Sequence, residues 1–152
     1  MTFTCLACRL PLSLPWRFET MAKVSAMEQG RILVVDDQEQ SRELLVEFLK
    51  KKGYVVQSAA DGDEAWNLLN REPHYELVIT DLNMPVMDGL TLLQKIRERT
   101  FPMEVILQTG FAGYGVSTKA RELGAFAVLT KPLDLAALVQ IVDLALTSPA
   151  AA

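Results

Sequence analysis

From residue 31 onward, short apolar runs alternate with longer segments in which apolar residues recur every three or four positions. A short run rich in β-branched residues is typical of a strand buried on both faces, and the longer spacing is typical of an amphipathic helix. The apolar runs predict strands at Arg31–Val35, Tyr54–Ser58, Leu77–Thr80, Glu104–Gln108 and Ala127–Leu129. The segments between and after them predict helices over about Gln40–Lys52, from Asp61 onward, and over about Gly89–Glu98, Ser117–Leu123 and Leu133–Leu146.

The predicted helices carry recognisable end signals. Gly53 follows a lysine-rich last turn, where a C-terminal glycine belongs, and Asp88 is placed to cap the third helix. The second helix opens with acidic residues at the positive end of its dipole. The apolar residues that recur at helical spacing in the first helix are Leu44, Leu45, Phe48 and Leu49.

Five β–α units in succession predict one α/β domain, a doubly wound parallel sheet with helices on both faces. Right-handed crossovers leave few topologies, and the flavodoxin-like strand order 2-1-3-4-5 is the natural one. We expect residues 30–147 to form this domain, residues 1–29 to be a flexible N-terminal extension and residues 148–152 to be a C-terminal tail.

Composition narrows the class of protein. The chain has 152 residues, half of them apolar, and a net charge of −4, which suits an ordinary soluble globular domain. The acidic balance argues against direct nucleic-acid binding, and no apolar stretch reaches the ~18 residues of a membrane span. Cys5 and Cys8 are the only cysteines, too few for a tetrahedral zinc site, and their scarcity favours a cytoplasmic location.

Polar residues follow four of the predicted strands. Asp36 and Asp37 come directly after the first strand and Asp81 follows the third. Thr109 follows the fourth strand and Lys131 the fifth. Because the carboxyl ends of parallel strands meet at one edge, where ligands bind at the switch point of the topology, we expect these five side chains to converge.

Such a set suits phosphoryl chemistry. Carboxylates held close together repel unless a cation lies between them, and Mg²⁺ binds carboxylates while still accepting phosphate oxygens. One carboxylate can then act as a nucleophile towards phosphorus, in a reaction that depends on positioning and on neutralising the phosphoryl oxygens. The ammonium of Lys131 and the hydroxyl of Thr109 could share that work.

In combination, these motifs resemble the receiver domain of bacterial two-component response regulators. The resemblance covers about Arg31–Thr147 and implies that Asp81 is the phosphoacceptor and that Asp36 and Asp37 hold Mg²⁺. It implies that Asn83 supplies a backbone carbonyl to the metal. The segments that carry it are Val34–Asp37, Thr80–Gly89, Thr109-Gly110 and Lys131-Pro132.

The same resemblance implies roles for the last two strands and for partners. Thr109 would be the switch hydroxyl, and Lys131 would contact the phosphoryl group and precede a cis peptide bond to Pro132. The phosphodonor would be a histidine kinase or a phosphotransfer protein, with small acyl phosphates able to substitute. The family usually has Tyr or Phe three positions before the lysine, but this chain has Val128 there. Phe126 would face the same side as Val128 only in a regular strand.

We therefore expect a stand-alone regulator, with no output domain after Ala152, that signals by phosphorylation-dependent protein binding. At most, it would catalyse its own phosphorylation and dephosphorylation. One alternative is a Mg²⁺-dependent phosphatase with an aspartyl-phosphate intermediate, although Asn83 stands where such enzymes have a second Asp. Another is a receiver-like module that binds partners without phosphorylation, an option that Val128 keeps open.

Taken singly, each motif has a plainer interpretation. Asp36 and Asp37 could cap the following helix, Thr109-Gly110 could be a turn, and Lys131 could be a solvated surface lysine. The last helix is apolar nearly all round, and an apolar patch on a surface helix often marks a contact site. We hypothesise that the fourth helix, the fifth strand and the last helix bind a downstream protein target or a second copy of the chain.

Overall fold

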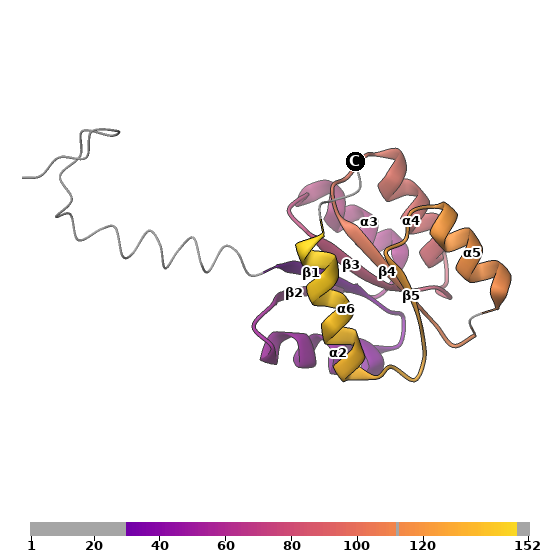
Figure 1. Cartoon of the computed structure of the whole chain (residues 1–152). Coiled ribbons are helices and arrows are strands. Elements are labelled where there is room, and N and C mark those ends of the chain that lie inside the picture. The colour runs from indigo at the N-terminus through magenta and orange to yellow at the C-terminus, as the bar shows by residue number, and fades with distance from the viewer. Residues whose placement is uncertain (1–29, 112, 149–152) are drawn as a thin grey trace, which may run out of the picture.

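The structure is a computed structural model of the chain, and it describes residues 30–111 and 113–148. Within these residues, strands and helices alternate along the chain (Figure 1). The strands are β1 (Arg31–Val35), β2 (Val55–Ala59), β3 (Leu77–Asp81), β4 (Glu104–Thr109) and β5 (Ala127–Thr130). The helices are α2 (Glu39–Lys51), α3 (Gly62–Arg71), α4 (Gly89–Glu98), α5 (Tyr114–Glu122) and α6 (Leu135–Thr147).

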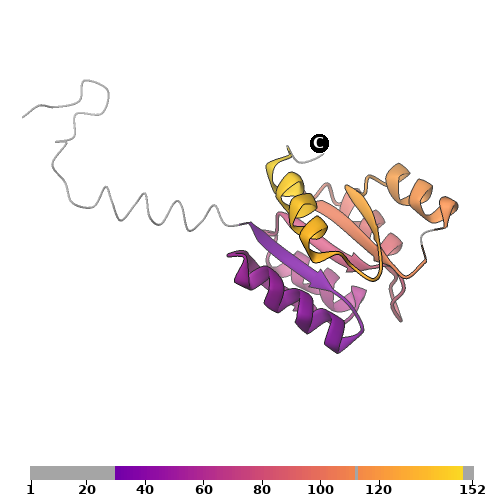
Figure 2. The same cartoon turned by 60° about the horizontal axis from the view of Figure 1, so that its bottom comes forward.

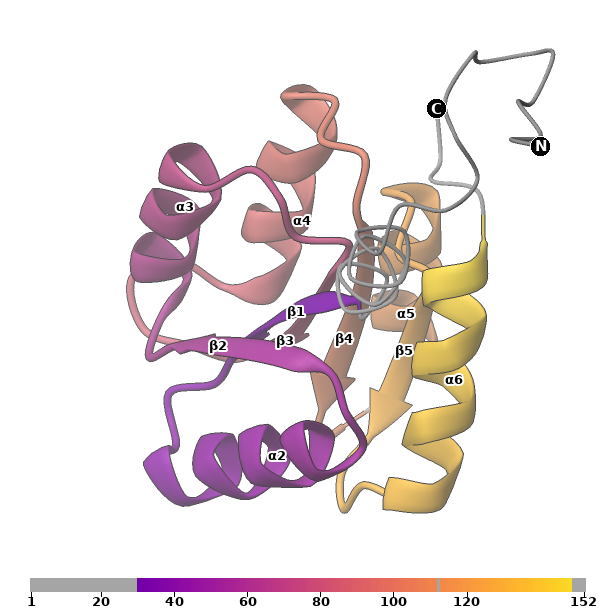
Figure 3. The ribbon, with the colours of Figure 1, turned by 90° about the vertical axis from the view of Figure 1, so that its left-hand side faces the viewer.

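The five strands form one sheet in the order β2-β1-β3-β4-β5, and every neighbouring pair is parallel. The predicted fold class and strand order are thereby confirmed. Helices α2 and α6 cover one face of the sheet, and α3, α4 and α5 cover the other (Figure 2 and Figure 3). The switch point lies between β1 and β3, so their carboxyl ends lie side by side.

Two apolar cores follow from the alternation of side chains along the strands. Along β1, Ile32 and Val34 belong to the core beneath α2 and α6, whereas Leu33 and Val35 belong to the core beneath α3, α4 and α5. All four side chains are at most 1% exposed. The two central strands β1 and β3 are therefore fixed on both faces, which holds their last residues in place.

Aspartates anchor three helices at the carboxyl edge of the sheet. Asp61 accepts a hydrogen bond from the backbone N–H of Glu64 at the start of α3, and Asp134 accepts from the first turn of α6. Asp88 accepts from the N–H of Thr91, which confirms the predicted cap of α4. Such caps satisfy backbone donors that the helix leaves unpaired.

Three expectations from the apolar pattern were wrong in detail. Strand β5 lies at the edge of the sheet, and its residues are partly or fully exposed rather than buried on both faces. Helix α5 begins at Tyr114, three residues before the predicted start at Ser117, because its N-cap is a glycine with no side-chain signal. Helix α6 begins at Leu135 rather than Leu133, directly after its Asp134 cap.

The outer segments of the chain remain outside this description. The proposed extension of residues 1–29, with Cys5 and Cys8, and most of the proposed tail fall beyond the described residues. Within residues 30–111 and 113–148, no helix combines the length and the apolar character needed to cross a bilayer.

Candidate functional site

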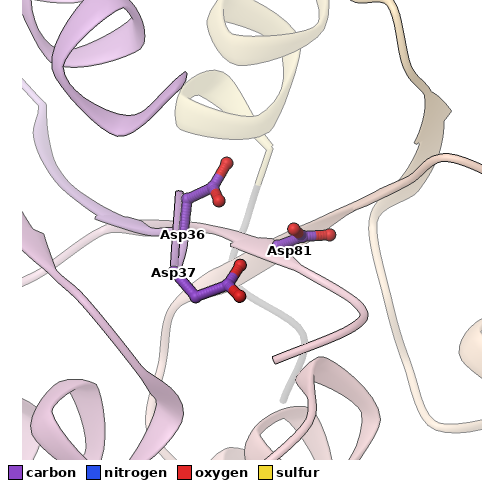
Figure 4. A group of neighbouring side chains, drawn as sticks. All are labelled: Asp36, Asp37 and Asp81. Atoms are coloured by element: carbon purple, nitrogen blue, oxygen red, sulfur yellow. The ribbon is translucent and has the colours of Figure 1, made fainter. Parts of the chain in front are cut away.

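Three carboxylates meet at the carboxyl edge of the sheet, where β1 and β3 end. Asp36, Asp37 and Asp81 each offer an oxygen that lies within 4.8 Å of those of the other two. Asp36 is 3% exposed and Asp81 is 7% exposed, whereas Asp37 is open to solvent. Figure 4 shows the three side chains converging from the ends of the two strands. Two of the three carboxylates are thus buried, and the third is accessible to solvent.

Backbone and side-chain bonds hold Asp36 in place. Its backbone N–H donates to the carbonyl of Ala59 at 3.2 Å, and its Oδ1 accepts the N–H of Gln38 at 2.9 Å. The guanidinium of Arg42 donates to the carbonyl of Asp36 at 2.8 Å. The N-cap of α2 is Gln38, which makes no side-chain cap bond, so Asp36 and Asp37 do not cap this helix.

The ammonium of Lys131 bridges two of the carboxylates. Its Nζ lies 3.1 Å from Asp81 Oδ2 and 3.2 Å from Asp36 Oδ2. Burial by itself would lower the pKa of Lys131, but the hydrogen bonds and charges of Asp81 and Asp36 outweigh it and raise the pKa. The lysine therefore stays protonated and offsets one of the three negative charges. The Lys131-Pro132 peptide bond is cis, as the family resemblance implies.

The helix after β3 packs directly against the residue that ends the strand. A Cβ atom added to Gly89 would lie 2.5 Å from the carbonyl oxygen of Asp81 and 3.0 Å from the side chain of Leu107. The N–H of Gly89 donates to the carbonyl of Leu82 at 2.9 Å, which closes the β3–α4 loop. Only glycine allows this approach, so Gly89 fixes the backbone beneath the Asp81 carboxylate.

The β3–α4 loop contains a strained turn at Val86, between Asp81 and the start of α4. Val86 has a φ of 69°, a conformation costly for a β-branched residue, and its side chain is 89% exposed. The N–H of Met87 donates to the carbonyl of Pro85 at 2.9 Å, which closes a three-residue turn around Val86. Met87 is buried at 7% exposure and anchors the loop in the core.

Thr109 lies at the same edge, but its hydroxyl is directed to its own loop. The side chain is fully buried, and Oγ1 donates to the carbonyl of Phe111 at 2.9 Å. The same oxygen accepts the N–H of Phe111 at 3.1 Å. The backbone N–H of Lys131 donates to the carbonyl of Thr109 at 2.8 Å, so the two residues are neighbours through their main chains.

The remaining positions singled out in the sequence have different surroundings. Asn83 is exposed, two residues beyond Asp81. Val128 packs against the core beneath α3, α4 and α5, whereas Phe126 packs against the opposite core. The two side chains therefore face opposite sides of the sheet, and Phe126 does not take the position of the aromatic residue that the family usually has at Val128.

Sequence reasoning missed the contacts that surround the predicted residues. Arg42, which holds the Asp36 carbonyl, lies on the first turns of α2 and carries no motif of its own. An apolar groove of about 510 Å³ opens beside Lys131. The groove lies where α2 packs against the loop before α6, so the sequence alone does not reveal it. Its lining consists of Ser41, Leu44, Leu45, Gln108, Lys131, Pro132, Leu133 and Leu135.

The cluster fits a hard divalent cation. Three carboxylates face a single bridging ammonium, so negative charge remains in excess, and Asp37 is accessible from solvent. Mg²⁺ prefers such oxygen donors and retains other coordination positions for water or phosphate oxygens. The carboxylate of Asp81 also lies next to an ammonium that could neutralise a phosphoryl oxygen attached to it.

Comparisons with known proteins identify a family. Residues 32–143 match the family model described as the response regulator receiver domain. The chain is 37% identical over 115 residues to a probable chemotaxis protein CheY of Rhizobium etli, covering 74% of this chain and 88% of that protein. It is 34% identical over 109 residues to sporulation initiation phosphotransferase F of Bacillus subtilis, covering 72% and 87%. It spans only 27 to 28% of some longer regulatory proteins that it also matches.

A solved structure shares the fold. A chain in the crystal structure of the CheX–CheY–BeF3–Mg²⁺ complex from Borrelia burgdorferi superposes with a TM-score of 0.73 at 30% sequence identity. The match covers 78% of this chain and 90% of that one. The family match, the relatives and the fold point to one family.

Proposed function

The chain belongs to the response regulator receiver domain family, and we propose that it accepts a phosphoryl group on Asp81 and signals by phosphorylation-dependent protein binding. The donor would be a histidine kinase or a phosphotransfer protein. The observation that carries the proposal is the position of the Asp81 carboxylate, 3.1 Å from the ammonium of Lys131 and beside Asp36 and Asp37.

In the proposed reaction, a carboxylate oxygen of Asp81 attacks phosphorus while the bond from phosphorus to the donor breaks. The donor keeps the electron pair of that bond, and Asp81 becomes an acyl phosphate. The ammonium of Lys131 is already adjacent, so it would neutralise an oxygen of the incoming group without first being recruited. Stabilisation prepared in advance is the main contribution a protein makes to phosphoryl transfer.

We assign Asp36, Asp37 and Asp81, with the backbone carbonyl of Asn83, to a Mg²⁺ site. The geometry of the carboxylates and their excess negative charge support the assignment. When bound, the metal would supply further neutralisation of the phosphoryl oxygens. Asp36 is buried and held by Arg42 and Gln38, so its carboxylate would keep its direction as the metal arrives.

The proposed output surface lies on α5, β5 and α6, for a downstream protein target or a second copy of the chain. Leu144 on α6 is 62% exposed, and β5 is only partly covered at its edge of the sheet. Sedimentation with and without phosphorylation, compared between the parent protein and a Leu144→Asp variant, tests this surface. A phosphorylation-dependent increase in mass that Leu144→Asp removes would support it, and equal sedimentation throughout would count against self-association.

Acetyl phosphate with Mg²⁺, read by intact mass, tests the proposed function. We expect the parent protein to gain one phosphoryl group and Asp81→Asn to gain none. Asp88→Asn is the matched control, because Asn also caps helices and the change removes a nearby exposed carboxylate without touching the cluster. Labelling of Asp81→Asn would contradict the assignment, and turnover of phosphate monoesters would favour the phosphatase alternative.

A further inference from the structure

The hydroxyl of Thr109 is fully engaged with one neighbouring residue. It donates its hydrogen to the carbonyl of Phe111 at 2.9 Å and accepts the N–H of the same residue at 3.1 Å. Thr109 thus holds both backbone polar groups of Phe111. Thr109 itself is fully buried at the end of β4, so the part of this pair that meets solvent is Phe111.

The hydrogen count makes this arrangement incompatible with a second role for the hydroxyl. A hydroxyl has one hydrogen to donate, and a phosphoryl oxygen can only accept. Thr109 follows the residue paired with Asp81 in the sheet, since Asp81 is in register with Gln108. If Thr109 donates to a phosphoryl group on Asp81, the carbonyl of Phe111 must lose its bond.

The side chain that this exchange would release is an exposed aromatic ring. Phe111 is 78% exposed, and its ring lies over Gly113, where an added Cβ atom would meet the ring at 3.0 Å. Tyr114, at the start of α5, is 91% exposed. On β5, Val128 has no ring to move, and Phe126 packs on the opposite face of the sheet.

We propose that this chain reads out phosphorylation through Phe111 on the β4–α5 loop, which is released when the Thr109 hydroxyl turns to the phosphoryl group. The inference rests on the proposed function, because it requires an acyl phosphate on Asp81. It places the moving aromatic residue two positions after Thr109 rather than on β5. Phe111 and the start of α5, with Tyr114, then form the surface that differs between the two states.

Two properties of the site favour this exchange. Phe111 is 78% exposed, so its ring can move without leaving a cavity in the core. The charged phosphoryl oxygens are stronger acceptors than the carbonyl of Phe111. Two states that are close in free energy can be shifted by one covalent modification, because only the difference in interaction between the states matters.

Fluorine NMR of 4-fluorophenylalanine incorporated at position 111 tests the proposal. The same sample, treated with acetyl phosphate and Mg²⁺, is read by intact mass to measure the phosphorylated fraction. We expect a new resonance for the probe at Phe111 that grows with this fraction. A matched probe at Phe126 should keep its chemical shift, because that ring lies against the opposite core.

Two substitutions connect the response to the hydroxyl. Thr109→Ser retains the donor and should retain the new resonance, whereas Thr109→Ala should lose it when spectra are compared at equal phosphorylated fractions. An unchanged probe at Phe111 in fully phosphorylated protein would overturn the inference and leave the proposed function intact. A response at Phe126 instead, or a full response in Thr109→Ala, would also overturn it. Absence of any acyl phosphate would overturn the proposed function itself.

Discussion

The two halves of the carboxyl edge differ in how much of the site is already assembled. The acceptor half consists of β1, β3 and the β3–α4 loop, and its buried carboxylates Asp36 and Asp81 are already bridged by Lys131, which reaches across from the end of β5. The readout half consists of β4, β5 and α5, and here the hydroxyl of Thr109 is bonded to Phe111. Under the proposed function, the acceptor half would need no rearrangement of Lys131, whereas the readout half would have to exchange hydrogen bonds before it could respond.

The packing of the outer part of the readout half contributes to the difference. Strands β1, β3 and β4 are buried, whereas the edge strand β5 is partly exposed and Phe111, just beyond β4, is mostly exposed. A well-packed region resists displacement, and a region with fewer buried contacts can occupy alternative arrangements at small cost. A regulator needs both properties, because the chemistry requires fixed geometry and the signal requires a second state.

The largest effect is expected from Gly89→Ala in the acceptor half. The new methyl group would lie 2.5 Å from the carbonyl oxygen of Asp81, so either the helix or the strand must move, at a cost of about 3 kcal/mol. Gly115→Ala in the readout half is the control, since its Cβ meets nothing within 4 Å and α5 should gain up to about 1 kcal/mol. Urea unfolding measures both, and equal effects would contradict the proposed contrast.

The next effect is expected from Lys131→Met, which removes the cation shared by the two halves. Two charge-assisted hydrogen bonds disappear and buried carboxylates are left facing one another, so stability should fall by about 2 kcal/mol. Added Mg²⁺ should restore much of this loss, because a divalent cation can occupy the same negative cluster.

Urea titrations with and without Mg²⁺ measure the effect of Lys131→Met. Lys119→Met, which replaces an exposed lysine on α5, should change stability by less than about 0.5 kcal/mol. A Lys131→Met protein as stable as the parent without Mg²⁺ would show that the bridge does not hold the acceptor half together.

A smaller effect, in the stabilising direction, is expected from Val86→Gly. Glycine adopts the φ of 69° without strain, and the lost side chain is 89% exposed, so unfolding should cost about 1 kcal/mol more. Val55→Gly on strand β2, where the backbone is extended, should instead destabilise the protein. Thermal unfolding measures both variants. A loss of stability in Val86→Gly would show that the backbone at Val86 is not strained.

At neutral pH, the smallest effect is expected at the opposite end of the sheet, which serves as a reference for both halves. Burial, followed by a hydrogen bond to Asp143, raises the pKa of Tyr54 to about 12. The folded state therefore holds this proton more tightly than the unfolded state, and its contribution to stability is complete below pH ~10 and is lost as pH rises towards about 12.

Stability measured between pH ~10 and about 12 should fall less steeply in Tyr54→Phe than in the parent. Phosphoryl acceptance at neutral pH should be unchanged, because Tyr54 lies just before β2, at the end of the sheet away from the acidic cluster. An identical pH dependence in both proteins would contradict the raised pKa of Tyr54.

Much of the fold could be predicted from the sequence because the local and global signals agree. The apolar runs locate β1 and β3 to within one residue, and their following aspartates lie where the topology places a site. Leu44 shows the limit of the pattern, because it has helical spacing but is 61% exposed beside the groove. Periodicity marks an apolar position, and only the packing of neighbouring elements decides whether it is covered.

The state of the readout half could not be predicted. The sequence places Thr109 after β4, but its hydrogen-bond partner depends on the side-chain torsion and on the path of the following loop. Phe111 is aromatic, but nothing else in the sequence marks it as a functional residue. Likewise, Phe126 and Val128 are two residues apart and would share a face in a regular strand, but β5 begins only at Ala127, and they lie on opposite faces.

One measurement tests most directly whether the acceptor half does what its geometry supports. Protein phosphorylated with acetyl phosphate and Mg²⁺ is reduced with borohydride, which converts an aspartyl phosphate to homoserine, and the peptides are sequenced by tandem mass spectrometry. The account predicts homoserine at position 81 alone. Homoserine in place of Asp36, Asp37 or any other aspartate, or a phosphorylated protein that yields none, would contradict it.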